Sequence, residues 1–436
     1  MNHLPWHFQG ATSRTPLRTP MIALLALAMS GALYPLAASA QPSASPPPSA
    51  SLTLRQVYFA AVARLPETRS ASQRRDAAAA QQRAAQAWTP EPPAFEGSLK
   101  TDRIGFNKGS REWVVGVAVP LWLPGQRHAA RSLAQAEFSA VDPALTAASW
   151  RVAGEVRDAW WTGHLAQVDL DLAQTRLGNA ERLAADVALR VRAGDLARAD
   201  QHQAGAAVAA AQAELASIKT AQAQAMLLLR RLAGPLASAA LATAPEPLPG
   251  DAAALDTSIA AHPALREAMA RAEVARRAGA QARLQGRAAP ELALAATRGR
   301  GDVGEAYGQS ITIGLRIPFG ADDRQQARLA SAGAELTEAE TRLAAERERI
   351  EADMAFARER LALARSMADA SERRATLARE SLGFLDKAFR LGEIDLPARL
   401  RIALEAMEAE RQNARARIEV AQAISQWRQA LGLSPV

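Results

Sequence analysis

Histidines, acidic side chains and glycine-rich segments are the groups in this 436-residue chain that could support chemistry. Beyond the N-terminal region the histidines are scattered, at His128, His164, His202 and His262. None of them has a metal-ligand spacing such as H-E-x-x-H. The glycines at 299–304 lie in a predicted hairpin loop, whereas a phosphate-binding loop would join a strand to a helix. We therefore expect no enzyme, no cofactor and no metal site.

The charged residues indicate solvated helix faces. The net charge is +7, but arginines alternate with glutamates, as in residues 345–360, instead of forming a basic patch with aromatic side chains. Glu338 and Arg342 have the spacing of an ion pair on one helix face. We therefore expect no nucleic-acid partner.

The N-terminus has the pattern of an export signal. Two arginines precede a short apolar run from Met21 to Leu36, and Ala-Ser-Ala at 38–40 is a typical cleavage site. We predict a signal peptide at 1–40, with Met21 as an alternative start, and a Pro/Ser-rich lead-in at 41–51. The chain has no cysteine. It therefore lacks a thiol for a lipid anchor, and we do not expect a lipoprotein.

One stretch occurs twice, at residues 112–127 and 309–324. Each copy begins with strand-like alternation, breaks at a proline (Pro120, Pro318) and then opens a long helical pattern. Pro318 lies 198 residues after Pro120, and Gly392 lies 198 residues after Gly194. The shared spacing predicts a duplicated architecture, with a first structural repeat at 52–234, a linker at 235–254 and a second repeat at 255–433.

Each repeat is predicted to contain a helix, a β-hairpin, a very long helix, a turn and another helix. In the first repeat the helix covers 52–87, the hairpin 95–119, and the two later helices 125–193 and 196–232. In the second repeat the corresponding segments are 255–286, 291–317, 323–390 and a last helix that ends at 431–432. The linker and the hairpin loops are marked by proline and glycine.

Two features of the long helices carry further expectations. Pro143 should kink or break the first of them, because proline removes a hydrogen bond from the helix ladder. In the second long helix, predicted at 323–390, large apolar residues recur every seven positions, which predicts a coiled-coil seam. Its members are Leu329, Leu336, Leu343 and Ile350, and then Leu377, Phe384 and Leu391.

The second strand of each hairpin alternates between an apolar side and a polar or small side. The apolar sides comprise Trp113, Val115, Val117 and Val119, and then Ile311, Ile313, Leu315 and Ile317. Such alternation over about 10 residues is typical of a membrane barrel with its apolar side toward lipid. Four strands cannot close a channel alone, so the pattern predicts an oligomer. The alternative from the pattern is a pair of hairpins that cover the ends of a soluble helical bundle.

From Leu52 to Leu433 the chain resembles the TolC-like outer-membrane efflux proteins. The resemblance rests on the duplicated element order, on the strand-Pro-helix junctions and on two turns, V-R-A-G-D-L-A-R-A-D at 191–200 and F-R-L-G-E-I-D-L at 389–396. The sequence P-L-W-L-P-G-Q-R at 120–127 is similar to the branch that serves cobalt–zinc–cadmium and copper–silver efflux pumps.

The resemblance implies a mainly α fold with a small β part. Duplicated coiled-coil hairpins would form a periplasmic α-helical barrel, and the two β-hairpins would give four strands to a trimeric 12-stranded outer-membrane β-barrel. A homotrimer of this kind lies in the outer membrane of a Gram-negative bacterium. It is the passive exit duct of a tripartite pump, with a periplasmic adaptor and an inner-membrane pump of the RND type, here for heavy-metal cations. The alternative function is a soluble periplasmic coiled-coil adaptor or scaffold.

In this family the two helix–turn–helix tips contact the adaptor and form the closed gate. The matching tip residues are Arg192, Gly194, Asp195, Leu196, Arg390, Leu391, Gly392, Glu393 and Leu396. The acidic gate residues of the second tip are replaced here by Ala398 and Arg401, the arginine that pairs across the gate is replaced by Ile394, and Asp200 is retained. We therefore expect different gate contacts, with Asp200, Asp395, Arg399 and Arg401 as candidates.

Overall fold

The computed structural model describes residues 51–105, 107–234, 241–250, 259–285, 288–319 and 323–436. The predicted signal peptide, nearly all of the lead-in, and parts of the linker and of the helix expected from residue 255 lie outside these ranges. Within them, no helix has both the length and the apolar character needed to cross a bilayer.

The N-terminal helix predicted at 52–87 is instead three helices. They are α1 (Leu54–Arg64), α2 (Pro66–Arg69) and α3 (Ala71–Gln86). Leu65 separates the first two because the residue before a proline is forced out of the helical region, and its backbone is extended. Thr53 and Gln56 form a reciprocal capping box that starts α1. The prediction of one continuous helix was therefore wrong at Pro66.

Two helices of 68 residues form the longest elements, α4 (Gln126–Ala193) and α8 (Asp323–Arg390). At 1.5 Å per residue each is about 100 Å long. Pro143 lies inside α4 without ending it, so the predicted break is absent. Proline removes only one ladder hydrogen bond, and α3 and α7 (Pro263–Leu284) pack against α4. An ion pair between Arg75 and Asp142 links α3 to α4 beside this proline.

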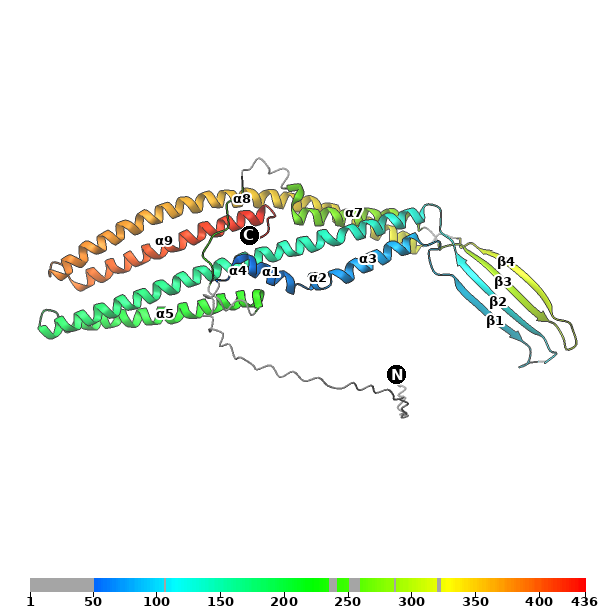
Figure 1. Cartoon of the computed structure of the whole chain (residues 1–436), viewed down its shortest axis with the longest axis horizontal. Coiled ribbons are helices and arrows are strands. Elements are labelled where there is room, and N and C mark those ends of the chain that lie inside the picture. Colours follow the sequence, from blue (N-terminus) through cyan, green and yellow to red (C-terminus); the bar gives the residue numbers. More distant parts are fainter. Residues whose placement is uncertain (1–50, 106, 235–240, 251–258, 286–287, 320–322) are drawn as a thin grey trace, which may run out of the picture. The chain divides into compact units, whose positions relative to one another are not determined.

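Each long helix forms an antiparallel hairpin with the helix that follows its turn. Figure 1 shows α5 (Arg198–Ala233) beside α4, and α9 (Leu396–Ala430) beside α8. The two hairpins meet through α4 and α9, so the packing order is α5, α4, α9, α8. The core near α1 is built around Trp160 and Trp161, and elsewhere the buried residues are mostly alanines. Small side chains let the helix backbones approach closely.

The four strands form one antiparallel sheet in the order β1-β2-β3-β4. They are β1 (Ala94–Thr101), β2 (Arg111–Pro120), β3 (Glu291–Arg300) and β4 (Gly308–Arg316). The inner pair, β2 and β3, joins the two repeats, with Val115 opposite Ala296. Both hairpins therefore belong to one sheet, and β1 and β4 are its outer strands.

The heptad pattern of α8 divides into two parts. Ile350 is buried, in agreement with the first part of the predicted seam. Leu377, Phe384 and Leu391 are instead 64%, 68% and 75% exposed, so they do not form the seam inside this chain. Buried Ala375 and Phe389, each two residues away from an exposed member, face inward instead. Sequence periodicity identified a real stripe, and the second part of that stripe is exposed in the single chain.

Candidate functional site

The sheet has one continuous apolar face that is exposed in the single chain. Strand register puts Phe95 opposite Val117, Val117 opposite Leu294, and Leu294 opposite Ile313, so these four side chains share a face. The exposed apolar residues of this face are Phe95, Leu99, Trp113, Val115, Val117, Leu292, Leu294, Ile311, Ile313 and Leu315. Ile317, just after β4, is also exposed, and Val119 is half-buried.

The opposite face of the sheet is polar or small. Its members include Glu96, Ser98 and Lys100 of β1, and Ser310, Thr312 and Gly314 of β4. Lys100 lies opposite Glu112, and Arg316 contacts Glu291 at 3.5 Å. Alternation along the strands therefore separates a mainly apolar side from a mainly polar side, with Val114 of β2 as an apolar exception on the polar side.

Both helix–turn–helix tips end their first helix with the same backbone motif. Gly194 and Gly392 have left-handed backbones, with φ of 88° and 77°. Asp195 N–H donates to the Arg190 carbonyl, and Glu393 N–H donates to the Ala388 carbonyl, both at 2.9 Å. This is the Schellman geometry, which favours glycine. The repeated sequence therefore produces two tips of matching backbone geometry.

The side chains of the predicted tip set divide into exposed and packed residues. The polar members Arg192, Asp195, Arg390 and Glu393 are exposed, as is Leu391. Leu396 is buried in a small cluster that also contains Val187, Ala204 and Phe389, and Leu196 packs against it. This cluster contains residues of both helical hairpins, so apolar contacts hold the two tips together.

At the tips, the ring of Phe389 also contacts two arginine side chains. The guanidinium groups of Arg190 and Arg399 each lie 5.1 Å from its ring centre. Arg399 also pairs with Asp386 at 2.7 Å. Sequence reasoning named Arg399 as a gate candidate but missed Phe389, Arg190 and Asp386, whose roles depend on the packing of the two hairpins.

Of the other three gate candidates, two are helix-capping carboxylates and one is an exposed arginine. The Asp200 carboxylate accepts the N–H of Ala197, and the Asp395 carboxylate accepts the N–H of Ala398, each at 3.0 Å. Both acidic residues thus cap the start of a helix. Arg401 is exposed, and no described residue of its own chain forms an ion pair or hydrogen bond with it. It is therefore available for contacts outside the chain.

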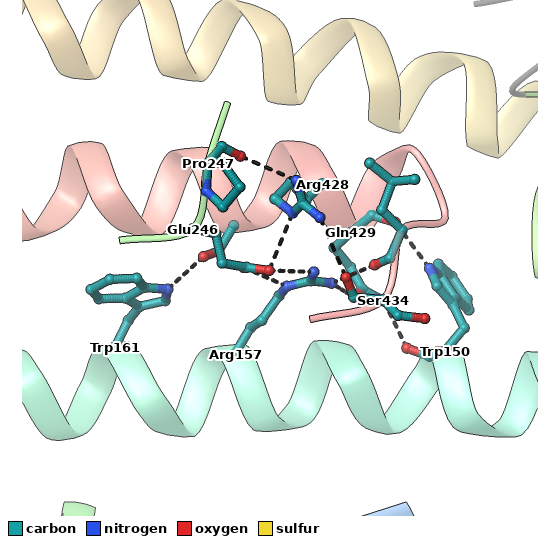
Figure 2. Close-up of polar contacts among 10 residues, drawn as sticks. Trp150, Arg157, Trp161, Glu246, Pro247, Arg428, Gln429 and Ser434 are labelled. Carbon is teal, nitrogen blue, oxygen red and sulfur yellow. Dashed lines mark hydrogen bonds and ion pairs between the residues drawn. The ribbon is translucent and has the colours of Figure 1, made fainter. Parts of the chain in front are cut away.

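A buried charge network connects α4, residues 241–250 and α9. Figure 2 shows Arg157 and Arg428 converging on the carboxylate of Glu246. Arg157 donates two hydrogen bonds of 2.9 Å to Glu246, and Arg428 donates one of 3.2 Å. The three residues are 1%, 9% and 5% exposed for Arg157, Arg428 and Glu246, respectively. Burial alone would raise the pKa of Glu246, but hydrogen bonds and the nearby arginine charges hold it below its usual value.

Further hydrogen bonds connect the same network to the C-terminal tail. Arg157 donates to the carbonyl of Leu433 at 3.1 Å, and Arg428 donates to the carbonyl of Pro247 at 3.1 Å. The Gln429 side chain donates to the Trp150 carbonyl, and the Trp150 indole donates to the Gln429 carbonyl (Figure 2). Sequence reasoning missed this network. The sequence feature that could have indicated the network is a single acidic residue, Glu246, within an otherwise uncharged segment from 236 to 250.

The four histidines lie apart from one another, and the described residues contain no group of three or more metal-ligating side chains close enough to hold an ion. Glu338 and Arg342 form the predicted ion pair along one face of α8. His164 is buried among Trp160 and Trp161. Its burial lowers its pKa. These groups support packing, and we assign them no chemistry.

His262 should make stability depend on pH. It caps α7 by accepting the Ala264 N–H through Nδ1 at 3.3 Å, and its ring lies edge-on to Trp150 at 4.8 Å. Burial lowers its pKa to about 4; the nearby charge of Arg349 lowers it further, and the carboxylates of Glu346 and Asp353 oppose the shift with smaller effects. The unfolded chain binds a proton near pH 6.5, whereas the folded chain does so only near pH 4. The His262 contribution is therefore complete above pH 6.5 and is lost as the pH falls toward 4.

The pH effect of His262 can be measured by unfolding the His262→Asn variant and the wild type at several pH values. Asparagine keeps the capping acceptor but does not titrate. We expect the fall in unfolding free energy between pH 6.5 and 4 to be smaller in the variant, by about 1.4 kcal/mol for each pKa unit of the shift. Identical pH profiles for the two proteins would contradict this assignment.

The fold and sheet define a class of protein in which duplicated helical hairpins are joined to a small antiparallel sheet with an apolar face. The sequence profile of the outer membrane efflux protein family matches residues 57–235. This match confirms the predicted resemblance to outer-membrane efflux proteins over that part of the chain. No curated protein matches the chain.

Solved structures of similar fold cover most of the chain. CusC, described for transmembrane channel formation, has a TM-score of 0.72 at 17% identity, over 87% of this chain and 92% of its own. The outer membrane protein VceC from Vibrio cholerae gives 0.71 at 16% identity, over 88% and 97%. The outer membrane channel CmeC from Campylobacter jejuni gives 0.70 at 15% identity, over 87% and 85%. The predicted fold class is therefore confirmed.

Proposed function

We propose that this protein is the outer-membrane exit duct of a tripartite efflux pump. The observation that carries the proposal is the apolar face of the four-stranded sheet, backed by a polar face and bounded by the unpaired edges of β1 and β4. An apolar face of this kind, opposite a water-compatible one, is stable where one side meets lipid and the other a channel. The match of residues 57–235 to the outer membrane efflux protein family and the likeness to solved outer membrane channels support the same function.

Three copies would supply twelve strands to one closed barrel. Closure removes the exposed edges of β1 and β4, which would otherwise invite aggregation or leave backbone groups unpaired in lipid. The helical hairpins would continue the conduit through the periplasm. Transport would be passive in the duct, with energy supplied by an inner-membrane pump of the RND type.

The two tips are the proposed contact site for a periplasmic adaptor. Their exposed polar side chains, such as Arg192, Asp195 and Glu393, stand on rigid Schellman turns and are available for a partner. A fixed turn loses little conformational entropy when a partner binds. Heavy-metal cations are the proposed cargo, supported by the sequence P-L-W-L-P-G-Q-R at 120–127.

Charge reversal at Arg401 should change the closed state of the channel. In a symmetric assembly, this exposed cation of α9 would be repeated near the gate. We expect Arg401→Asp to alter single-channel conductance or the closed-state lifetime, because a cation near a narrow passage becomes an anion. Planar-bilayer recordings measure both. Arg342→Asp, far from the tip, is the control, and recordings of Arg401→Asp that match the wild type would refute a gate role.

Fractionation and conductance test the proposed function as a whole. The full chain should appear in the outer-membrane fraction, require detergent for extraction, and run as a trimer. Purified protein should form ion-conducting pores in planar bilayers. A soluble monomer without pore activity would favour the periplasmic scaffold instead. Deletion strains exposed to zinc, cobalt, cadmium, copper or organic toxins would then identify the cargo.

A further inference from the structure

The apolar face of the sheet carries positive charge at one end. Alternate residues of a strand share a face, so Arg111 of β2 lies on the same side as Trp113. Arg298 and Arg300 of β3 lie on the same side as Leu294 for the same reason. Among the described strands, no other residue on this face is charged. The three residues are called here the arginine cluster.

The arginine cluster lies at the end of the sheet that carries the hairpin loops. β2 begins at Arg111, after the loop from β1, and β3 ends at Arg300, before the loop to β4. At the other end of the sheet, β2 leads into α4 and β4 leads into α8. In the proposed duct the helices lie in the periplasm, so the arginine cluster would lie on the outer side of the membrane.

The spacing along β3 places the arginine cluster at the border of the apolar band. Leu292 lies near the helix end of that band, and Arg298 follows six residues later. At about 3.3 Å per residue, the two are about 20 Å apart. The apolar band of a membrane barrel is about 25 Å tall and has aromatic residues at its borders. Trp113 is directly opposite Arg298, as such a border requires. The arginines would therefore meet lipid headgroups.

The arginine cluster has no carboxylate partner within the described chain. Arg111 is directly opposite Arg300, and like charges in this position destabilise a strand pair. Of the acidic loop residues, Asp102 and Glu305 each accept a backbone N–H of their own loop. Asp302 is exposed and forms an ion pair with none of the three arginines. An anion bound from outside the chain would therefore relieve the repulsion between the arginines.

Tyr307 orients two of the arginines. The guanidinium carbons of Arg298 and Arg300 lie 5.0 and 5.1 Å from the centre of its ring. Arg300 also donates through Nε to the carbonyl of Gly109 at 3.1 Å. A guanidinium group that stacks on an aromatic ring still has N–H donors at its edge. The terminal nitrogens of both arginines can therefore bind the oxygen atoms of a phosphate group.

We propose that the arginine cluster binds the phosphate of a phosphorylated glycolipid of the lipid A type in the outer leaflet. The fork of N–H donors in arginine matches two phosphate oxygens, and basic clusters beside a membrane bind anionic headgroups. Such a lipid has acyl chains beneath its phosphate groups, and these chains would cover Val115 and Ile311 in the neighbouring row of the apolar face. This inference rests on the proposed outer-membrane duct and adds a lipid site on its outer surface.

Native mass spectrometry of the full-length trimer in detergent, titrated with lipid A, measures this binding. The test variant is Arg298→Gln/Arg300→Gln. The matched control is Lys100→Gln/Arg316→Gln, which removes two positive charges from the polar face of the same sheet. We expect the affinity of the test variant for lipid A to fall about tenfold or more, because charge-assisted hydrogen bonds are lost. The control should bind lipid A like the wild type. Equal loss in both variants would contradict the proposal.

Two further ligands separate the possible sources of the phosphate. Lipid A without its phosphate groups should bind the wild type as weakly as intact lipid A binds the test variant. Inorganic phosphate in excess should leave intact lipid A bound, because it has no acyl chains to contact the apolar face. Equal affinity for intact and dephosphorylated lipid A would overturn the proposal. Complete displacement by inorganic phosphate would assign the cluster to a free anion and would also overturn it.

Chemical protection supplies a measurement that needs no variant. Phenylglyoxal modifies accessible guanidinium groups, and mass spectrometry of peptides locates the modified residues. In the wild-type trimer, lipid A should slow the modification of Arg111 and Arg298, which are exposed in the single chain. Arg342, exposed on α8, is the control and should react at the same rate with and without lipid A. Unchanged rates at Arg111 and Arg298 would contradict the proposal.

The outcomes also separate this site from the proposed function. A wild type that forms trimers and conducts ions, but binds lipid A no better than the test variant does, would overturn the lipid site and leave the duct intact. A wild type that is a soluble monomer without pore activity would overturn the duct, and with it the membrane location of the arginine cluster.

Discussion

Replacing Glu246 with glutamine should lower the free energy of unfolding by about 3–5 kcal/mol, because it leaves two buried guanidinium groups without a counter-charge. Glutamine has nearly the same shape, so the loss isolates the charge. Arg157 and Arg428 contact this carboxylate while almost fully buried, and water cannot replace it. Thermal or urea unfolding followed by tryptophan fluorescence reports the change, since Trp150 and Trp161 lie in the same region.

The control for Glu246 is Glu338→Gln, which breaks an exposed ion pair with Arg342. Exposed pairs contribute about 0–1 kcal/mol, so this variant should unfold almost like the wild type. If both variants lose the same stability, burial of the charge network is not what makes Glu246 important. A Glu246→Gln protein as stable as the wild type would show that carbonyl oxygens alone satisfy the two arginines.

Introducing an arginine on the apolar face of the sheet should impair membrane assembly severely. Ile313 is 74% exposed on that face, and a charge there would meet the hydrocarbon of the bilayer. The expected cost of Ile313→Arg is about 2–4 kcal/mol in each copy if the site lies near the bilayer midplane. We expect a large fall in the amount of trimer recovered from the outer-membrane fraction, measured by quantitative immunoblotting.

The adjacent residue supplies a matched control for this substitution. Thr312 is in the same strand, but its side chain points to the polar face. Thr312→Arg should therefore assemble normally and change the conductance or ion selectivity instead. Loss of assembly in both variants would indicate a general intolerance of the strand to arginine. Normal assembly of Ile313→Arg would contradict lipid contact at this face.

The sequence predicted the elements better than it predicted their contacts. The strands, the long helices and both tip turns follow from local rules, since alternation, heptads and left-handed glycines act over a few residues. The break before Pro66 also follows a local rule, since the residue before a proline is disfavoured in a helix. The prediction of one continuous helix did not apply that rule. The continuity of α4 through Pro143 depends instead on neighbouring helices, which no local pattern reports.

The same contrast between local patterns and long-range contacts applies to the candidate functional sites. Gly194 and Gly392 were identified from the residue type that a helix end requires, and their geometry agrees. The network of Arg157, Glu246 and Arg428 joins residues from three distant segments, and ordinary charged residues in a sequence do not reveal such meetings. Leu377 and Phe384 were found as a periodic stripe, but periodicity alone could not show that both side chains are exposed in the single chain.

The pairing of β2 with β3 has a consequence for how the protein reaches its native state. Gly116 is opposite Ala295, so the centre of the sheet joins residues separated by most of one repeat. Contacts between residues so far apart in sequence form slowly, whereas each helical hairpin needs only its own segment. The inner edge of β2 must therefore remain unpaired until β3, in the second repeat, has been synthesised. During that interval the newly made chain is vulnerable to aggregation and would benefit from a holding chaperone.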